Sequence, residues 1–210
     1  MVLNSLSRLI SINTLTGILG IIYSILLVQY FGASREIEIF FIAQTLLYVT
    51  FSLTQTGHLA EIFLPEFLKL ENIAKNKGFN ALNVILNRFL LFGCPFLIVF
   101  FVSAAYMSEL IAPGFASEEK ALVATIFRLL VPLLAFQIIV SFFRIVLNGK
   151  SIFGTPELIV AITVAVNIFF LVFFYETLGI WTLVYSMFVG RLFEFLFYIF
   201  IMYRIGYRYE

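Results

Sequence analysis

Cysteine and histidine are almost absent from this sequence of 210 residues, and their scarcity excludes several kinds of site. With a single cysteine, Cys94, no internal disulfide can form. Cys94 has no neighbouring cysteine or histidine with which to bind zinc, so we interpret it as a packing residue. The single histidine, His58, cannot hold a metal alone. The sequence therefore predicts neither a metal nor another cofactor.

Charged residues are also scarce, at 12% of the chain, whereas an average soluble domain has roughly 25%. The net charge of +1 lacks the clustered cations that nucleic-acid binding requires, so we predict no DNA or RNA partner. The sequence contains no P-loop, nucleophile elbow or HExxH pattern. For these reasons an enzyme is not expected.

Apolar residues are abundant instead: 62% of the chain is hydrophobic, and 27 residues are phenylalanine. A membrane-spanning helix needs about 20 mostly apolar residues, because its backbone must satisfy its own hydrogen bonds in lipid. Six segments reach this length, so we predict an all-α membrane protein in which residues 1–210 form a single transmembrane domain. We expect its six helices at about residues 9–31, 37–67, 84–106, 122–147, 158–175 and 180–203.

Lysine and arginine are unevenly distributed between the two ends of these segments. Cytoplasmic loops of membrane proteins retain the excess of positive residues, which favours placing both termini in the cytoplasm. This orientation puts most of the basic residues inside, namely Arg8, Lys69, Lys75, Lys77, Arg88, Lys150, Arg204 and Arg208. Only Arg35 and Lys120 then fall outside.

Five ionisable residues in or beside the apolar segments are candidates for a substrate cavity or an interhelical network, because charge at membrane depth is costly and often marks function. These residues are Glu38, Glu61, Arg128, Arg191 and Glu194. Arg191 and Glu194 are three residues apart and share a helix face, where an ion pair lowers the cost of burial. A structural pair and a substrate contact both remain open.

The other three candidates also have structural interpretations. Glu61 shares a helix face with His58, so the two form either a proton-binding or cation-binding site or an interfacial pair. Arg128 begins a run that ends at Pro132, whose kink either acts as a hinge or shapes the bundle. Glu38 lies near Arg35 at the outer start of the second segment, a position compatible with gating or with simple solvation.

Short polar motifs separate the apolar segments, and their order and spacing resemble the N-terminal half of the MurJ/MviN lipid II flippase family. The likeness extends over nearly the whole chain. Its loop motifs are Gly32 with Ala33, and Pro113 and Gly114 with Phe115. The remaining matches are Ile18-Leu19-Gly20, Phe40-Phe41, Gly57, Phe63-Leu64-Pro65, Arg128 with Pro132, Leu147-Asn148 and Gly190.

This resemblance implies one six-helix lobe of a two-lobe flippase that moves polyprenyl-diphosphate-linked sugars, such as a peptidoglycan precursor, across the bacterial inner membrane by alternating access. It implies a membrane lipid or lipid-linked glycan as ligand, and a second six-helix lobe or a homo-oligomer as partner. The family binds the diphosphate with cavity arginines, and at the matching positions this chain has Gly17, Tyr23, Phe51 and Ser52. Glu38 matches an acidic position of the family, and Glu194 an amide position.

Two other functions stay open at this point. The missing arginines and the match to one lobe alone are also compatible with a noncatalytic membrane assembly subunit, or a truncated relic of such a transporter. A cation-coupled small-molecule exporter is the other alternative, in which Glu61, Glu194 or His58 would carry protons.

Overall fold

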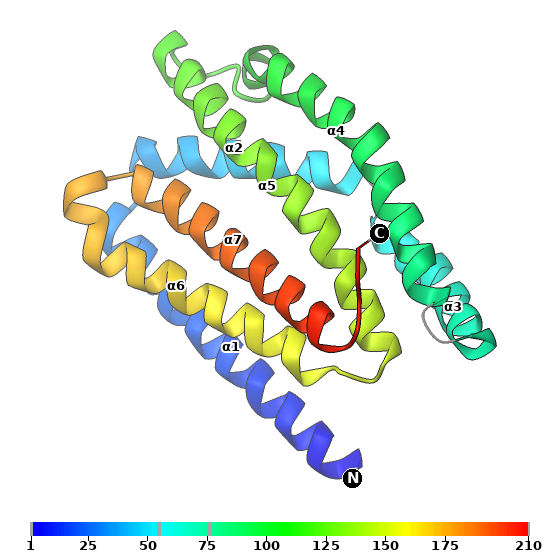
Figure 1. Ribbon diagram of the computed structural model, residues 1–210. Helices are drawn as coiled ribbons and strands as arrows, with labels where there is room; N and C mark the ends of the chain where they lie inside the picture. The colour runs from blue at the N-terminus through cyan, green and yellow to red at the C-terminus, as the bar shows by residue number, and fades with distance from the viewer. Residues whose placement is uncertain (1, 54–55, 75–76, 210) are drawn as a thin grey trace.

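The computed structural model describes residues 2–53, 56–74 and 77–209, and for residues 2–6, 8 and 56–61 it describes the backbone alone. These residues form seven α-helices and no strand. Figure 1 shows them as α1 (Val2–Phe31), α2 (Arg35–Leu53), α3 (Thr56–Ile73), α4 (Lys77–Ile111), α5 (Ser117–Gly149), α6 (Gly154–Leu178) and α7 (Trp181–Arg204). All except α3 are long and apolar enough to cross a membrane, which confirms the prediction of an all-α protein with six candidate spans.

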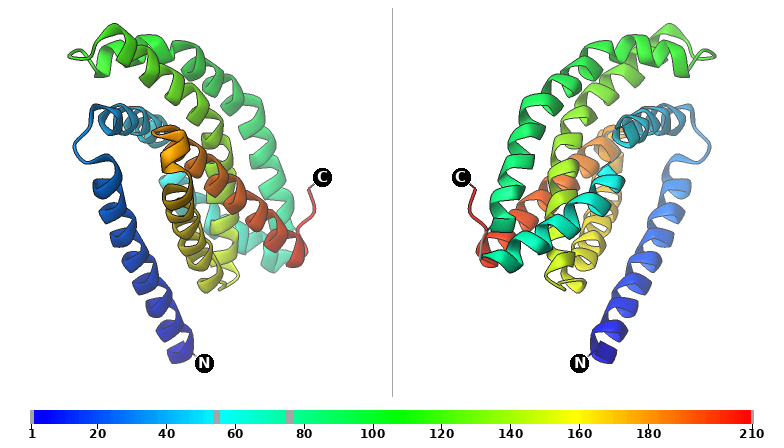
Figure 2. Two further views of the ribbon diagram at one scale, coloured as in Figure 1. Left: turned by 90° about the vertical axis from the view of Figure 1, so that its left-hand side faces the viewer. Right: turned by 90° about the vertical axis from the view of Figure 1, so that its right-hand side faces the viewer.

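The helices pass between two sides of the molecule (Figures 1 and 2). One side, which we call the outer side, carries the α1–α2, α4–α5 and α6–α7 connections. The other, the inner side, carries the N-terminus, the end of α3, the start of α4 and the α5–α6 connection. These names follow the orientation predicted from the basic residues. The side chains of Arg8 and Lys75, two of those residues, lie outside the described part of the chain.

The prediction of one helix over residues 37–67 is wrong, because α2 ends at Leu53 and α3 begins at Thr56. In Figure 1, α2 runs across the bundle while α3 descends toward the inner side. Thr54, Gln55 and Gly57 interrupt the apolar run in the sequence, and threonine and glycine are weaker helix formers than leucine. Each of the other five predicted ranges coincides with one helix, although α4 begins well before residue 84 and ends after residue 106.

A tight turn joins α1 to α2. Gly32 adopts a positive φ of 58°, and its N–H donates to the carbonyl of Val28 at 2.8 Å, which ends α1. The Ser34 hydroxyl then accepts a hydrogen bond from the N–H of Ile37 at 3.4 Å and caps the start of α2. The small residues of the Gly32–Ser34 motif are therefore explained by the backbone conformation that this turn requires.

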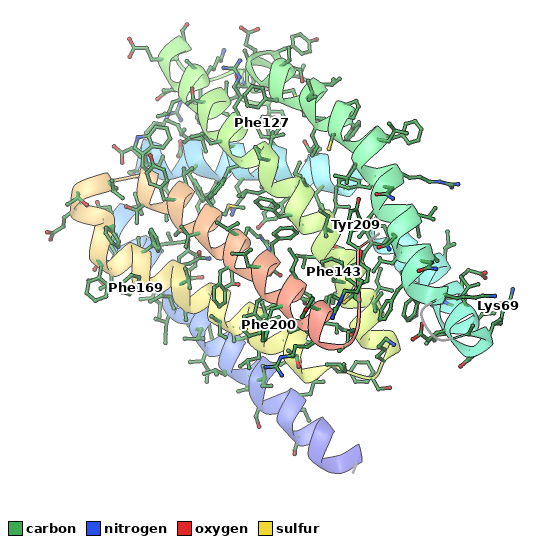
Figure 3. All side chains as sticks on the ribbon, in the orientation of Figure 1. Lys69, Phe127, Phe143, Phe169, Phe200 and Tyr209 are labelled. Atoms are coloured by element: carbon green, nitrogen blue, oxygen red, sulfur yellow. The ribbon has the colours of Figure 1, made fainter. Side chains whose placement is uncertain are left out.

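Helix α5 lies at the centre of the molecule and packs against α2, α3, α4 and α7. Two apolar clusters flank it, one around Phe127 toward the outer side and one around Phe143 toward the inner side. Figure 3 shows both rings on α5 in the interior, whereas Phe169 and Phe200 are exposed on the surface of the bundle. Lipid is as apolar as these side chains, so close packing rather than the hydrophobic effect holds the helices together.

Helices α4 and α5 curve together in Figure 2 and contact each other along their length. Each contains one proline in its interior, Pro95 in α4 and Pro132 in α5. Proline has no N–H to donate, so each removes one bond from the helical ladder and favours a bend. Pro132 therefore contributes to the shape of the bundle.

On the inner side, polar contacts link different helices and the C-terminal segment to one another. Lys150, just after α5, binds the carboxylate of Glu71 on α3 at 2.8 Å. The Tyr207 hydroxyl donates to Asn83 on α4 at 2.6 Å and ties the segment after α7 to the bundle. Burial raises the pKa of Tyr207 to about 12, so the hydroxyl keeps its proton and remains a donor.

Candidate substrate cavity

A cavity of about 260 Å³ lies between α1, α2, α6 and α7. It exists because α1 packs on α6 while α2 packs on α5, so α1 and α2 diverge from their shared turn (Figure 2). Apolar residues form part of its wall, including Phe40, Leu183 and Met187. Its uncharged polar residues are Tyr23, Gln44, Tyr48, Thr163, Asn167 and Ser186. Arg191 and Glu194 complete the polar lining.

These polar residues stand at membrane depth. Gln44, Asn167 and Arg191 lie near the midpoints of α2 (35–53), α6 (154–178) and α7 (181–204). Polar groups at this depth are costly in lipid and normally face another helix or a hydrated space. The cavity supplies such a space.

The charged part of the cavity wall is an ion pair on α7. The Nη1 atom of Arg191 lies 2.6 Å from Oε2 of Glu194, so the i, i+3 spacing brings the side chains into contact. Glu194 is buried, and the side chain of Arg191 is 26% exposed. Because the two charges cancel, this pair contributes no net charge to the cavity.

Gly190 brings α7 close to α6 beside the cavity. A Cβ atom at this position would lie 3.0 Å from a methyl carbon of Thr163 and 3.3 Å from Oδ1 of Asn167. Glycine therefore permits the approach that places both residues in the cavity wall. The buried Oδ1 atom of Asn167 has no hydrogen-bond partner among the described residues.

Glu38 lies away from the cavity, in a cluster on the outer side. Arg35 holds this cluster together, since its guanidinium binds Glu38 at 2.7 Å and Glu119 at 2.8 Å. The same guanidinium lies 3.7 Å from the centre of the Phe115 ring and donates to the carbonyl of Gly114 at 3.4 Å. Glu38 is thus joined to two residues of the family loop motif.

The loop motif itself forms a turn between α4 and α5. The N–H of Phe115 donates to the carbonyl of Ala112 at 3.1 Å, so Pro113 and Gly114 occupy the two middle positions. Glu119 accepts the N–H of Ala116 at 2.8 Å at the start of α5. Glu119 was not among the candidates, because its contact with Arg35 depends on folding and leaves no local pattern in the sequence.

Arg128 does not line the cavity. Arg128 is half-buried on α5, and its Nε donates to the carbonyl of Phe101 on α4 at 3.3 Å, so it belongs to an interhelical contact. Glu61 belongs to α3, but its side chain and that of His58 lie outside the described part of the chain. Among the four candidates whose side chains the structure describes, Arg191 and Glu194 alone lie together in the cavity.

The positions that match the family's cavity arginines are divided between the cavity and its surroundings. Tyr23 lines the cavity. Gly17 is exposed on α1, with open space around it, whereas Phe51 packs against both apolar clusters. The Ser52 hydroxyl donates to the carbonyl of Val49 on its own helix at 2.7 Å. Sequence reasoning missed Gln44 and Asn167, whose only signal was a single amide within an apolar segment.

The sequence profile described as lipid II flippase MurJ matches residues 27–210. The chain belongs to the MurJ lipid II flippase family. It is 28% identical to the probable lipid II flippase MurJ of Buchnera aphidicola subsp. Acyrthosiphon pisum (strain APS), over 97% of this chain and 42% of that protein. It is 27% identical to the corresponding protein of subsp. Schizaphis graminum (strain Sg), over 93% of this chain and 40% of the relative. The chain therefore spans about two fifths of the length of these curated relatives.

A solved structure of the family supports the same fold. The lipid II flippase MurJ in an inward closed conformation superposes with a TM-score of 0.80 at 21% sequence identity, over 96% of this chain and 42% of that chain. Together with the six apolar helices, family membership makes this chain a multi-pass protein of the bacterial inner membrane. The resemblance drawn from the loop motifs is confirmed.

Proposed function

We propose that this chain is one lobe of a flippase that moves polyprenyl-diphosphate-linked sugars across the bacterial inner membrane. The observation that carries this proposal is the polar cavity at mid-membrane depth, between α1, α2, α6 and α7, in a chain of the MurJ family. Such a cavity gives a hydrophilic headgroup a route through the bilayer while its lipid tail remains in hydrocarbon. Transport of this kind breaks no covalent bond, so the chain acts as a transporter rather than an enzyme.

Alternating access requires two bodies that rock against each other around a shared site. This chain supplies one such body. Helix α5 packs against α2, α3, α4 and α7, while α6 packs against α7 and α1, so the helices form one packed unit. We assign the opposing body to a second six-helix lobe or to a second copy of this chain. The relatives are more than twice as long as the matched region, which is compatible with a second body of similar size.

The candidate residues take two different roles in this proposal. Arg191 and Glu194 belong to the cavity wall, where headgroup atoms would pass. Glu38 acts on the outer side, because Arg35 links it to the α4–α5 connection and so holds the two outer turns together. Arg128 joins α5 to α4 through its hydrogen bond to Phe101 and so helps to set the shape of the lobe.

Depletion of the chain in its own bacterium tests the proposal with the protein as the cell makes it. We expect lipid-linked precursor to accumulate on the cytoplasmic face of the inner membrane, as measured by its protection from an enzyme added to the periplasmic face. A plasmid copy of the wild-type gene should restore the normal distribution. A copy with the control substitution Asn80→Leu should do the same, since Asn80 is exposed on α4 away from the cavity. An unchanged distribution after depletion would refute the proposal.

A further inference from the structure

The cavity has no net charge, and this restricts the part of a lipid-linked glycan that it fits. Its one ion pair leaves neither an uncompensated cation nor an uncompensated anion in the described lining. A diphosphate needs cationic donors that are free to bind it, and an ammonium group needs a free carboxylate. The cavity suits neither ion, so an uncharged ligand fits it better.

Several polar atoms of the cavity lining are uncommitted hydrogen-bond acceptors. Thr163 and Ser186 donate their hydroxyl hydrogens to backbone carbonyls of their own helices, at 3.0 Å in both cases, and keep only lone pairs for a ligand. Asn167 contributes the buried Oδ1 atom that has no partner within the described chain. A buried acceptor without a partner is costly, so the site favours a ligand that brings hydroxyl or amide hydrogens.

Aromatic rings form another part of the lining. Tyr23, Phe40 and Tyr48 come from α1 and α2, opposite the acceptors of α6 and α7. The face of an aromatic ring is electron-rich and attracts polarised C–H groups, of which a sugar ring presents several on one side. The same sugar ring carries hydroxyl donors around its edge. The lining thus offers partners for both parts of a sugar.

The size of the cavity limits the ligand to a small group. Its volume of about 260 Å³ lies just below the roughly 300–1,000 Å³ of pockets that hold drug-sized molecules. One sugar ring fits within such a volume, whereas a disaccharide with a peptide attached does not.

We propose that the cavity between α1, α2, α6 and α7 is a binding site for one uncharged sugar ring of the lipid-linked glycan. The sugar hydroxyls donate hydrogen bonds to Oδ1 of Asn167, and the sugar ring packs on Tyr23 and Tyr48. This inference rests on the proposed flippase function and assigns the diphosphate to groups outside this cavity. The sugar is recognised by acceptors and aromatic rings, so the site distinguishes a glycosylated lipid from a bare one.

Binding to the full chain in lipid nanodiscs tests this proposal. The two probes are a polyprenyl diphosphate and the same lipid carrying one N-acetylhexosamine, and native mass spectrometry measures the affinity of each. We expect the glycosylated lipid to bind at least tenfold more tightly. Loss of one buried hydrogen bond typically lowers affinity about fivefold to tenfold, so Asn167→Leu should remove most of the preference. The matched variant Asn80→Leu should retain it.

Gln44→Leu provides a second variant in case Asn167→Leu fails to fold, because Gln44 is only half-buried and its amide nitrogen donates a long hydrogen bond to the Met187 sulfur, at 3.9 Å. It too should reduce the preference for the glycosylated lipid. Equal affinity of the wild-type chain for the two lipids would overturn the sugar site and leave the flippase proposal intact. Failure of both lipids to bind would likewise overturn the sugar site, whereas the flippase proposal is tested separately by depletion of the chain.

Discussion

Removing one charge of the buried Arg191–Glu194 pair should destabilise the protein strongly. The variant Glu194→Gln keeps the shape of the side chain but leaves the guanidinium of Arg191 without its carboxylate, which now lies 2.6 Å away. Breaking a buried ion pair on one side typically costs about 3–5 kcal/mol, because the remaining charge is uncompensated. Since the Arg191 side chain is 26% exposed toward the cavity, we expect about 3 kcal/mol, at the lower end of this range.

The double variant Arg191→Met with Glu194→Gln separates the charge effect from a packing effect. It removes both charges and keeps side chains of similar length, so most of the lost stability should return. Unfolding of the full chain in mixed micelles, with increasing SDS and circular dichroism as the signal, measures the free energy of unfolding of each variant. The reasoning is refuted if Glu194→Gln costs less than about 1 kcal/mol, or if the double variant is no more stable than the single one.

Three further predictions concern glycine and arginine positions. Gly32→Val should lower the free energy of unfolding by about 1–2 kcal/mol in the same SDS titration, because only glycine adopts the positive φ of this turn without strain. The control variant Gly17→Val, in open space within α1, should lower it by less. Gly190→Leu should cost about 1–3 kcal/mol through overpacking between α6 and α7, and a melting temperature equal to that of the wild type would contradict this packing. Arg35→Gln should change the free energy of unfolding by at most about 1 kcal/mol, since its ion pairs are exposed. It should nevertheless speed amide hydrogen exchange around Glu119. Unchanged exchange there would show that Arg35 does not hold the α4–α5 connection.

Much of the fold could be predicted from the sequence, because a lipid environment imposes a simple rule on each spanning helix. The break between α2 and α3 was missed because apolar residues continue on both sides of Thr54 and Gln55, and hydropathy averaged over a span does not register so short a polar interruption. Helix ends were also underestimated in α4, where polar residues such as Lys77 extend the helix beyond its apolar part.

The candidate site was predicted only where its contacts are local. Arg191 and Glu194 lie on one helix, so their spacing alone indicated that the two side chains meet. Gln44 and Asn167 were missed because each is a lone amide in an apolar run, and the cavity that joins them depends on the divergence of α1 from α2. The contact of Arg35 with Glu119 links residues that are far apart in the sequence, which no spacing rule reveals.

Translocation in reconstituted vesicles tests the flippase function most directly. The chain is purified from its native membrane with its bound partners and incorporated into vesicles whose inner leaflet contains a fluorescent polyprenyl-diphosphate-linked sugar. Accessibility of the sugar to an enzyme added outside then reports its passage across the bilayer. We expect passage in vesicles that contain the wild-type chain and a strongly reduced rate with Glu194→Gln, whose cavity carries an uncompensated charge. A rate no higher than that of protein-free vesicles would contradict a flippase function for this chain.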